Sequence, residues 1–419
     1  MAAKTNLREA TAQPAPLDRE ILATKVFTPA TPVSESALFA GRMKELRRVI
    51  DTISQRGRHS MIFGERGVGK TSLASVISSR LRVPDAVVIA PRVNCDSNDT
   101  YTTLWRKVFS QIDLLKKTPA IGFQLSIFEE TLKAADVIKE NAGPDEVRRL
   151  LSLLADTGML IIIFDEFDRI LDGNTRRMMA DTIKALSDHD VPVTVVIVGV
   201  ADTVDELISQ HESIERAIIQ TKIPPMSIPE VEQIIDNGMG RLQMTIERAP
   251  RSEIAMMCQG FPYYAHSLGL HATRACLDRN ALNITHADVD TAIKLALLDV
   301  DQTIRSVYDR AVFSPQKDTL HAQVLLACAL AKAGEFGYFS ASAVREPLSA
   351  ITGRAYEIPG FSKHLKDFSE EARGRILQKE GETRKFRFRF RNPLMKPLII
   401  MKGIAEHRLS VDVLKRYQA

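Results

Sequence analysis

The sequence contains few cysteines, with only Cys95, Cys258, Cys276 and Cys328 among 419 residues. They lie far apart in the chain, and none of them forms the CxxC spacing of a zinc site. The pattern therefore favours neither a zinc site nor a disulfide framework. We interpret the four thiols as small buried hydrophobic groups in a protein of a reducing compartment.

Long apolar runs are also missing. No segment approaches the roughly 20 consecutive apolar residues that a transmembrane helix needs, and the first residues lack the hydrophobic stretch of a signal peptide. Hydrophobic residues nevertheless make up 45% of the chain, which is enough for two or three domains with substantial cores. We expect a soluble, cytoplasmic protein with no membrane partner.

A strong overall charge is absent too, since the formal net charge is only +4. The charges are unevenly distributed, however. Residues 314–419 contain 19 Lys and Arg against 11 Asp and Glu, which leaves a slightly acidic remainder. A basic C-terminal part points to an acidic partner there, and nucleic acid is one candidate.

Hydrophobic periodicity divides the chain into segments of different character. Buried strands alternate with amphipathic helices over 36–226, which predicts an α/β domain with a parallel sheet covered on both faces. Residues 116–143 form an insertion in this domain whose structure the pattern does not indicate. We expect strands at 61–63, 86–90, 159–164, 193–198 and 218–223, and helices at 41–55, 100–113, 145–156, 174–188 and 203–217.

The other segments contain no such alternation. Residues 1–35 are rich in proline, alanine and threonine and are expected to form a flexible arm. Residues 227–312 show only helical spacing and predict a helical lid. Three helices and a β-hairpin follow within 313–405, in the order of a winged helix-turn-helix, and 406–419 form a tail.

A glycine-rich loop follows the first strand of the α/β domain. It reads Gly64-Glu65-Arg66-Gly67-Val68-Gly69-Lys70-Thr71 and fits G-x-x-x-x-G-K-[ST] between a strand and a helix. Backbone N–H groups of such a loop converge on phosphate oxygens, the lysine reaches the β and γ phosphates, and the threonine can bind Mg²⁺. The predicted nucleotide-binding residues here are Gly64, Gly67, Val68, Gly69, Lys70, Thr71 and Ser72.

A second acidic motif lies at the end of the apolar strand Met159–Asp165, which reads MLIIIFD and precedes Glu166. Its carboxylates are expected at the carboxyl edge of the sheet, where ligands bind in open α/β folds. Asp165 is predicted to hold Mg²⁺, and Glu166 to polarise the water that attacks the γ phosphate. Solvated acids capping a buried strand are the alternative.

Together these motifs resemble those of AAA+ ATPases, in particular the branch shared by origin-recognition and initiation ATPases and by STAND-type signalling ATPases. The resemblance covers about residues 36–405 and implies ATP or ADP with Mg²⁺ as ligands. Leu38-Phe39-Ala40-Gly41-Arg42 is similar to the segment that borders the adenine in this group. The resemblance therefore implies nucleotide contacts by Phe39 and Arg42.

Two further positions follow from the resemblance. Asp202 occupies the place of the polar sensor 1 residue, which is usually Asn or Thr in the family. Arg216 matches the arginine finger, which acts in the site of a neighbouring subunit and implies a homo-oligomer; a solvated arginine at a helix end is the alternative. Both residues are predicted to act in hydrolysis.

The lid departs from the pattern of origin-binding relatives. Tyr263 stands where they carry the sensor 2 arginine, in the stretch Gly260-Phe261-Pro262-Tyr263-Tyr264. A Gly-x-Pro at this point is similar to the STAND signature, in which the lid backbone approaches the nucleotide, and so implies a contact by Pro262. The alternative is a proline that merely begins a helix.

Basic and aromatic residues alternate in Lys385–Arg391, which reads KFRFRFR. A strand with this sequence places its phenylalanines on one face, toward a core, and its cations on the other. Such a face can bind the phosphates of duplex DNA without reading its sequence. The predicted DNA contacts are Arg375, Arg384, Lys385, Arg387 and Arg389.

Two functions remain open at this point. One is an ATPase of the initiator or transposition-regulator kind that self-associates and binds DNA through its winged helix. The other is a STAND-like signalling or defence switch whose winged helix contacts a partner protein. No nuclease or protease signature is present, so either function implies a separate effector protein.

Overall fold

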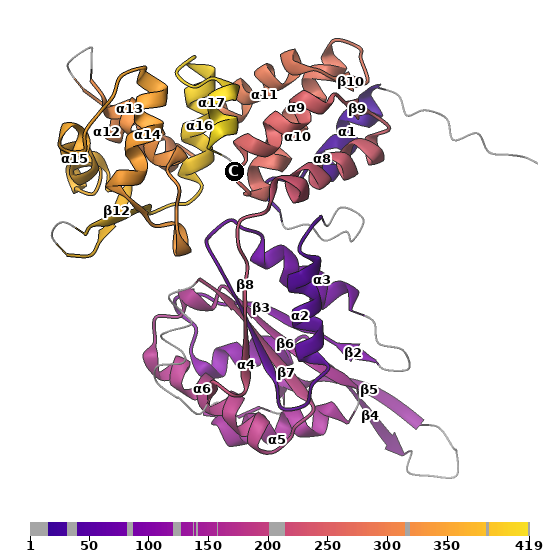
Figure 1. Cartoon of the computed structure of the whole chain (residues 1–419). Helices are drawn as coiled ribbons and strands as arrows, with labels where there is room; N and C mark the ends of the chain where they lie inside the picture. The colour runs from indigo at the N-terminus through magenta and orange to yellow at the C-terminus, as the bar shows by residue number, and fades with distance from the viewer. Residues whose placement is uncertain are drawn as a thin grey trace, which may run out of the picture.

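The computed structural model describes most of the chain, and its elements fall into an α/β unit, a helical lid and a C-terminal module (Figure 1). The lid and the C-terminal module lie side by side above the carboxyl edge of the sheet (Figure 1). The described residues are 16–31, 40–81, 87–119, 127–136, 138–139, 141–156, 158–200, 214–314, 319–382 and 385–417.

The α/β unit is built on a parallel sheet with the strand order β2-β6-β7-β1-β8, and β3 also pairs with β6. This confirms the predicted α/β class. The strands are β1 (His59–Phe63), β2 (Val88–Ile89), β3 (Arg92–Asn94), β6 (Met159–Asp165), β7 (Val193–Gly199) and β8 (Ile218–Lys222); the helices are α2 (Met43–Ile53), α3 (Lys70–Arg80), α4 (Tyr101–Phe109), α5 (Pro144–Ala155) and α6 (Gly173–Asp188).

Alternate residues of the central strands enter two separate cores. In β6, Ile161 and Ile163 pack with α2, α3 and the lid, whereas Ile162 and Phe164 pack with α4, α5 and α6. The period of two along a strand produces this division. Because both faces are covered, the strand is apolar throughout, and this explains why its position could be read from the sequence.

Three segments of the α/β unit differ from expectation or lie largely outside the described residues. The insertion that the pattern did not resolve contains an antiparallel hairpin of β4 (Asp113–Pro119) and β5 (Ile127–Lys133), which projects away from the sheet (Figure 1). Strand β3 was not predicted, since Arg92–Asn94 is too short to show a period. The helix predicted over 203–217 lies largely outside the described residues.

The lid consists of α8 (Ile228–Leu242), α9 (Arg248–Met257), α10 (Pro262–Asp278) and α11 (His286–Leu298), with the short parallel pair β9 (Thr245–Ile246) and β10 (Asn283–Ile284). A further helix, α1 (Pro16–Val26), packs beside α8 and α10 (Figure 1). Phe27, directly after it, is buried between Gly238 and Gly269, at each of which a Cβ would overlap the ring. The expectation of a loose arm is therefore wrong for this part, because two glycines create a groove that fits the ring.

The C-terminal module contains the predicted helices and hairpin. The helix α12 (Gln302–Val312), which was expected as the end of the lid, precedes them and packs against the module. Strand β13, which forms within the KFRFRFR segment, is the centre of a three-stranded antiparallel sheet in the order β11-β13-β12. Phe388 and Phe390 are buried, as expected of core residues. The remaining elements are α13 (His321–Leu330), β11 (Phe339–Ser340), α14 (Ala341–Thr352), α15 (Ile358–Asp367), β12 (Leu377–Glu380), β13 (Arg387–Phe390), α16 (Met395–Ala405) and α17 (Val411–Arg416), with 3₁₀ turns at Ala134–Asp136, Phe167–Arg169, Glu335–Gly337 and Glu371–Arg373.

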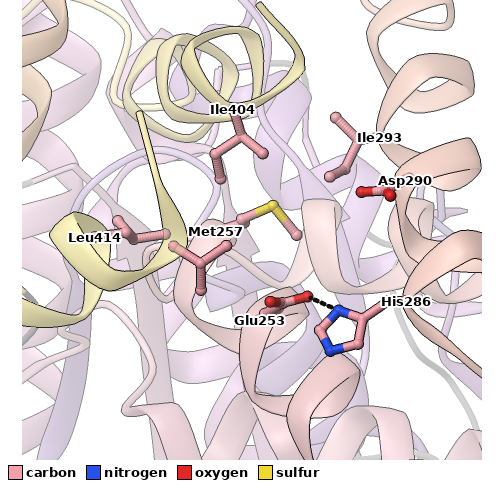
Figure 2. A pocket seen from close by; sticks show the side chains of 8 residues that line it. Glu253, Met257, His286, Asp290, Ile293, Ile404 and Leu414 are labelled. Carbon is pink, nitrogen blue, oxygen red and sulfur yellow. Dashed lines mark ion pairs between the residues drawn. The ribbon is translucent and has the colours of Figure 1, made fainter. Parts of the chain in front are cut away.

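The predicted tail contains α17, which packs against the lid. A pocket of about 220 Å³ lies at this contact, and Leu414 of α17 and Met257 of α9 both line it (Figure 2). Within this pocket Glu253 forms an ion pair of 2.8 Å with His286 (Figure 2). The end of the chain is thus part of the contact between the module and the lid.

Two simple expectations about composition can be compared with the structure. All four cysteines are buried, as predicted, and each is a free thiol. Burial raises the pKa of each thiol and so disfavours its thiolate form. Among the described residues, no helix is both long enough and apolar enough to cross a bilayer.

Candidate nucleotide-binding site

The glycine-rich loop connects β1 to α3 at the carboxyl edge of the sheet. Gly67 and Gly69 have φ angles of 87° and 98°, a region that other residues rarely adopt. Gly64 lies against the end of β8, where a Cβ would overlap the carbonyl oxygen of Ile223. The three glycines thus shape the loop, and the backbone N–H groups of the first turn of α3, including that of Ser72, have no partners within the helix.

The Lys70 ammonium lies inside this loop. Its Nζ donates hydrogen bonds to the carbonyl oxygens of Gly64, at 3.0 Å, and Glu65, at 2.8 Å. Burial lowers the pKa of Lys70, while the nearby carboxylates of Asp168 and Asp165 oppose the shift. The cation is therefore held beside the place where a P-loop receives phosphate.

Asp165 ends β6 directly beside the loop and is buried. Its Oδ1 accepts hydrogen bonds from the backbone N–H of Glu166, at 2.9 Å, and from the Thr71 hydroxyl, at 3.4 Å. Its Oδ2 is buried without a hydrogen-bond partner among the described residues. Burial raises the pKa of Asp165, so a cation here would be needed to favour the carboxylate.

The pair of Thr71 and Asp165 fits a magnesium ion. Mg²⁺ prefers hard oxygen ligands, and protein sites supply one or two carboxylates beside phosphate oxygens and water. A hydroxyl and a carboxylate with one unpartnered oxygen meet this requirement. We therefore retain both as candidate ligands.

Glu166 follows Asp165 with a φ angle of 56°, in the left-handed region. Non-glycine residues seldom adopt this conformation, and it is often found at functional sites. Its Oε2 pairs with Nη1 of Arg169 at 2.9 Å, and about half of the Glu166 side chain is exposed. The predicted base is thus close to Asp165 and accessible to water.

Arg42 lies on another side of the loop and is buried. Its guanidinium donates to the carbonyl oxygen of Val68, at 3.1 Å, and its backbone N–H donates to Oε1 of Glu230 in the lid, at 2.8 Å. Burial lowers the pKa of Arg42. Arg42 therefore connects the loop to the lid; Phe39, the other predicted contact of this segment, lies outside the described residues.

The start of α10 contacts the loop from above. A Cβ placed on Gly67 would lie 3.5 Å from the Phe261 ring. A Cβ placed on Gly69 would lie 3.6 Å from Pro262. Pro262 is thus near the loop, as the Gly-x-Pro signature implies. Tyr263 instead packs edge-on against Tyr264, with ring centroids 4.9 Å apart. It is a partly buried aromatic residue.

Arg216 lies at the opposite edge of the sheet. It precedes β8, whereas the loop follows β1, and β1 and β8 are parallel. Arg216 is exposed in an open cleft with Arg56, Arg58 and Lys184, and the Arg58 guanidinium donates to its backbone carbonyl. It cannot reach the loop of its own chain, so any catalytic role must be in a second subunit. Asp202 lies outside the described residues.

The predicted DNA contacts do not share one environment. Lys385 and Arg387 are exposed, and Arg375 pairs with Glu371 at 3.0 Å. Arg389 is partly buried; it donates to Oε1 of Gln378 at 3.0 Å and lines a cavity beside Glu65 of the loop. Arg384 lies outside the described residues.

Sequence reasoning missed two residues of this cavity, Glu65 and Lys396. Both line it, one from the glycine-rich loop and the other from the first turn of α16. The available signal was weak: Glu65 occupies an unrestricted position of the loop motif, and Lys396 is one of many cations near the C-terminus. Their proximity arises only from the docking of the module.

Comparison with known proteins agrees with this geometry. Residues 38–197 match the AAA ATPase domain family. The Walker-type ATPase PABY2304 of Pyrococcus abyssi shares the fold, with 15% identity, coverage of 90% of this chain and 99% of that one, and a TM-score of 0.51. The ORC2 protein (14% identity, 94% and 97% coverage) and the ORC1 protein in complex with DNA (17%, 91% and 97%), both of Aeropyrum pernix, have TM-scores of 0.47. No curated protein matches the chain.

Proposed function

We propose that this chain, with its AAA ATPase domain over residues 38–197, is an ATP-hydrolysing switch that couples its nucleotide state to self-association and to DNA binding by its C-terminal module. The observation that carries the proposal is the meeting of Lys70, Thr71 and Asp165, where one buried carboxylate oxygen has no hydrogen-bond partner among the described residues. Its main tests are the variants Lys70→Ala and Glu166→Gln, argued in the Discussion.

Each residue of the site has a separate task in this proposal. The loop N–H groups and Lys70 bind the phosphates, Thr71 and Asp165 hold Mg²⁺, and Glu166 orients and polarises the attacking water. Magnesium, when bound, supplies charge neutralisation at the phosphates. Arg42 and Pro262 hold the lid against the loop, so that the lid can respond to the nucleotide.

The proposed DNA surface is the exposed part of the hairpin β12–β13. Phe388 and Phe390 enter the core, which leaves the cations Lys385 and Arg387 on the outer face, with Arg375 near the start of β12. These side chains can neutralise phosphates of a duplex but have no partners specific for base edges. The expected binding is therefore weak in sequence preference and strongly dependent on salt.

Changing Arg375, Lys385 and Arg387 together to alanine is expected to weaken binding of the full chain to a duplex and to reduce the slope of log K against log salt by about 2 to 3, since each lost phosphate contact contributes roughly 0.9. Fluorescence anisotropy across a salt series measures this slope. The matched control replaces three exposed cations of α2, Lys44, Arg47 and Arg48. An equal loss in both triple variants would show that only total charge matters and would reject this surface.

Self-association through Arg216 has its own test. The variant Arg216→Ala alone is expected to lose about 10³-fold or more in turnover, as for other arginine fingers. Mixing it with Lys70→Ala is expected to restore part of the activity. In a mixed oligomer, a Lys70→Ala subunit supplies its intact Arg216 to the intact P-loop of a neighbouring Arg216→Ala subunit. Lys184→Ala, which removes another cation of the same cleft, serves as the control. Full turnover by Arg216→Ala at every protein concentration would exclude catalysis in trans.

A second function is favoured by one observation, the contact of the C-terminal module with the glycine-rich loop. Leu394 lies against Gly67, where a Cβ would approach its Cδ2 to 2.9 Å. In a STAND-like switch the module would be held in this position until nucleotide exchange released it toward a partner protein. Absence of duplex binding by the full chain at low salt, together with intact ATP turnover, would favour this function.

A further inference from the structure

A cavity of about 610 Å³ lies between the glycine-rich loop and the C-terminal module. It is bounded by the loop, the ends of β7 and β8, the connection from α13 to β11, and the connection from β13 to α16. Cations outnumber acids on its wall: five positive side chains face two negative ones. They are Arg66, Lys222, Arg389, Arg391 and Lys396 against Glu65 and Asp168. A wall of this composition suits an anionic ligand.

Specific contacts hold the module in this position. The Glu65 carboxylate touches Gly337, at which a Cβ would lie 2.7 Å from Oε1. The Lys222 ammonium lies 4.4 Å from the ring centroid of Phe336. From the lid, the Tyr264 hydroxyl donates to the carbonyl oxygen of Leu394 at 2.8 Å. The cavity is therefore a built space between packed elements.

Lys396 is a partly buried cation of the wall. Its ammonium forms no hydrogen bond or ion pair within the part of the chain that the structure describes, and only Glu65 offsets its charge. Burial lowers the pKa of Lys396 and raises the pKa of Glu65. Lys396 also occupies the first turn of α16, where the helix dipole disfavours a cation. A bound anion would offset both the burial of the Lys396 charge and its unfavourable interaction with the helix dipole.

The cavity adjoins the part of the loop that Lys70 contacts, because Gly64 and Glu65 line the cavity and their carbonyl oxygens accept hydrogen bonds from the Lys70 ammonium. Asp168 follows the magnesium candidate Asp165 by three residues, and Val200 directly follows β7. The Asp168 and Asp165 carboxylates both act on Lys70, which places that part of the wall within electrostatic range of the phosphate-binding lysine. Arg42 and Glu230 contact a different part of the loop, at Val68 and in the lid.

We propose that Lys396 and Arg389 of the C-terminal module bind a phosphoryl group in this cavity, and that the γ phosphate of ATP held by the loop of the same chain supplies it. This inference rests on the proposed nucleotide binding, and it adds the residues that recognise the terminal phosphate. Binding of ATP, but not of ADP, would hold the module against the loop.

The experiment compares the affinities of the full chain for a non-hydrolysable ATP analogue and for ADP by calorimetry. Lys396→Met and Arg389→Gln are each expected to weaken the ATP analogue about 10- to 100-fold, the range of a lost charge-assisted hydrogen bond, and to leave ADP within about 2-fold. Lys396→Arg is expected to keep most of the preference for ATP. The controls are Lys402→Met on the same helix and Arg345→Gln on α14, neither of which lines the cavity.

A further measurement, with inorganic phosphate, identifies the source of the phosphoryl group. If wild-type chain with ADP binds inorganic phosphate and Lys396→Met does not, the site is supported as a phosphate site that free phosphate can also fill. Equal weakening of ATP analogue and ADP by Lys396→Met would overturn the proposal, because the cation would then only shape the loop. Unchanged affinities for both would also overturn it. A wild-type chain that binds neither nucleotide would instead reject the proposed function itself.

Discussion

The Lys70→Ala variant is expected to lose nucleotide binding, with affinity for ATP reduced by at least about 100-fold. The lysine supplies charge-assisted hydrogen bonds to the β and γ phosphates in a P-loop, and the other cation of the loop sequence, Arg66, has an exposed side chain. Its Nζ also bonds to the carbonyl oxygens of Gly64 and Glu65, so its loss removes a constraint on the loop. Titration calorimetry with ATP and Mg²⁺ measures the effect.

The same variant has a clear control and a second readout. Lys44→Ala removes an exposed lysine from α2 of the same unit and is expected to bind ATP as the wild-type chain does. Ligand that binds only the folded state raises the apparent stability by RT ln(1 + [L]/Kd). Saturating ATP should therefore raise the melting temperature of wild type and Lys44→Ala, and should leave that of Lys70→Ala unchanged. An equal rise in all three proteins would contradict the assigned role of Lys70.

The parts of the structure that could be predicted are those encoded over short distances in the chain. The strand β6 was predictable because burial on both faces requires an unbroken apolar run. The glycine-rich loop was predictable because phosphate binding needs glycines at fixed spacing. The loop motif identified Thr71, and the acidic motif at the end of β6 identified Asp165. The parallel pairing of β1, β7 and β6 brings the two residues together.

The features that could not be predicted depend on contacts between distant segments. Phe27 is ordered by two glycines of the lid more than 200 residues away, and local composition contains no sign of them. Arg389 was assigned to DNA from its alternation with phenylalanine, but it lies beside Glu65 because the module docks on the loop. The alternation determines which face of a strand a residue occupies, and it does not determine what that face meets.

This docking changes how DNA binding and nucleotide state can be coupled. Arg387 and Arg389 lie on the same face of β13, two residues apart, yet one is exposed and the other lines the cavity. A movement of the module away from the loop would expose Arg389 and extend the basic face. In our proposal, release of the γ phosphate would permit this movement, so the DNA surface and the phosphate site would compete for Arg389.

Glu166→Gln is expected to retain ATP binding and to lose about 10²- to 10⁴-fold in turnover, the usual contribution of a positioned general base. Glutamine keeps the size and the hydrogen-bonding shape of the side chain but cannot polarise water as a carboxylate does. The partly exposed ion pair with Arg169 does not prevent this role, because an ion pair between exposed side chains is weak and can be exchanged for a bond to water. Single-turnover phosphate release, measured beside calorimetry, separates the two steps.

The control for this variant is Asp156→Asn, which makes the same change from carboxylate to amide at the exposed end of α5. It should bind and hydrolyse ATP normally. Normal turnover by Glu166→Gln would remove Glu166 from the reaction, and loss of both binding and turnover would indicate a structural role at its left-handed backbone position. Only retained binding with slow turnover is specific to a base that activates water, because neither a folding defect nor a weakened phosphate site produces that combination.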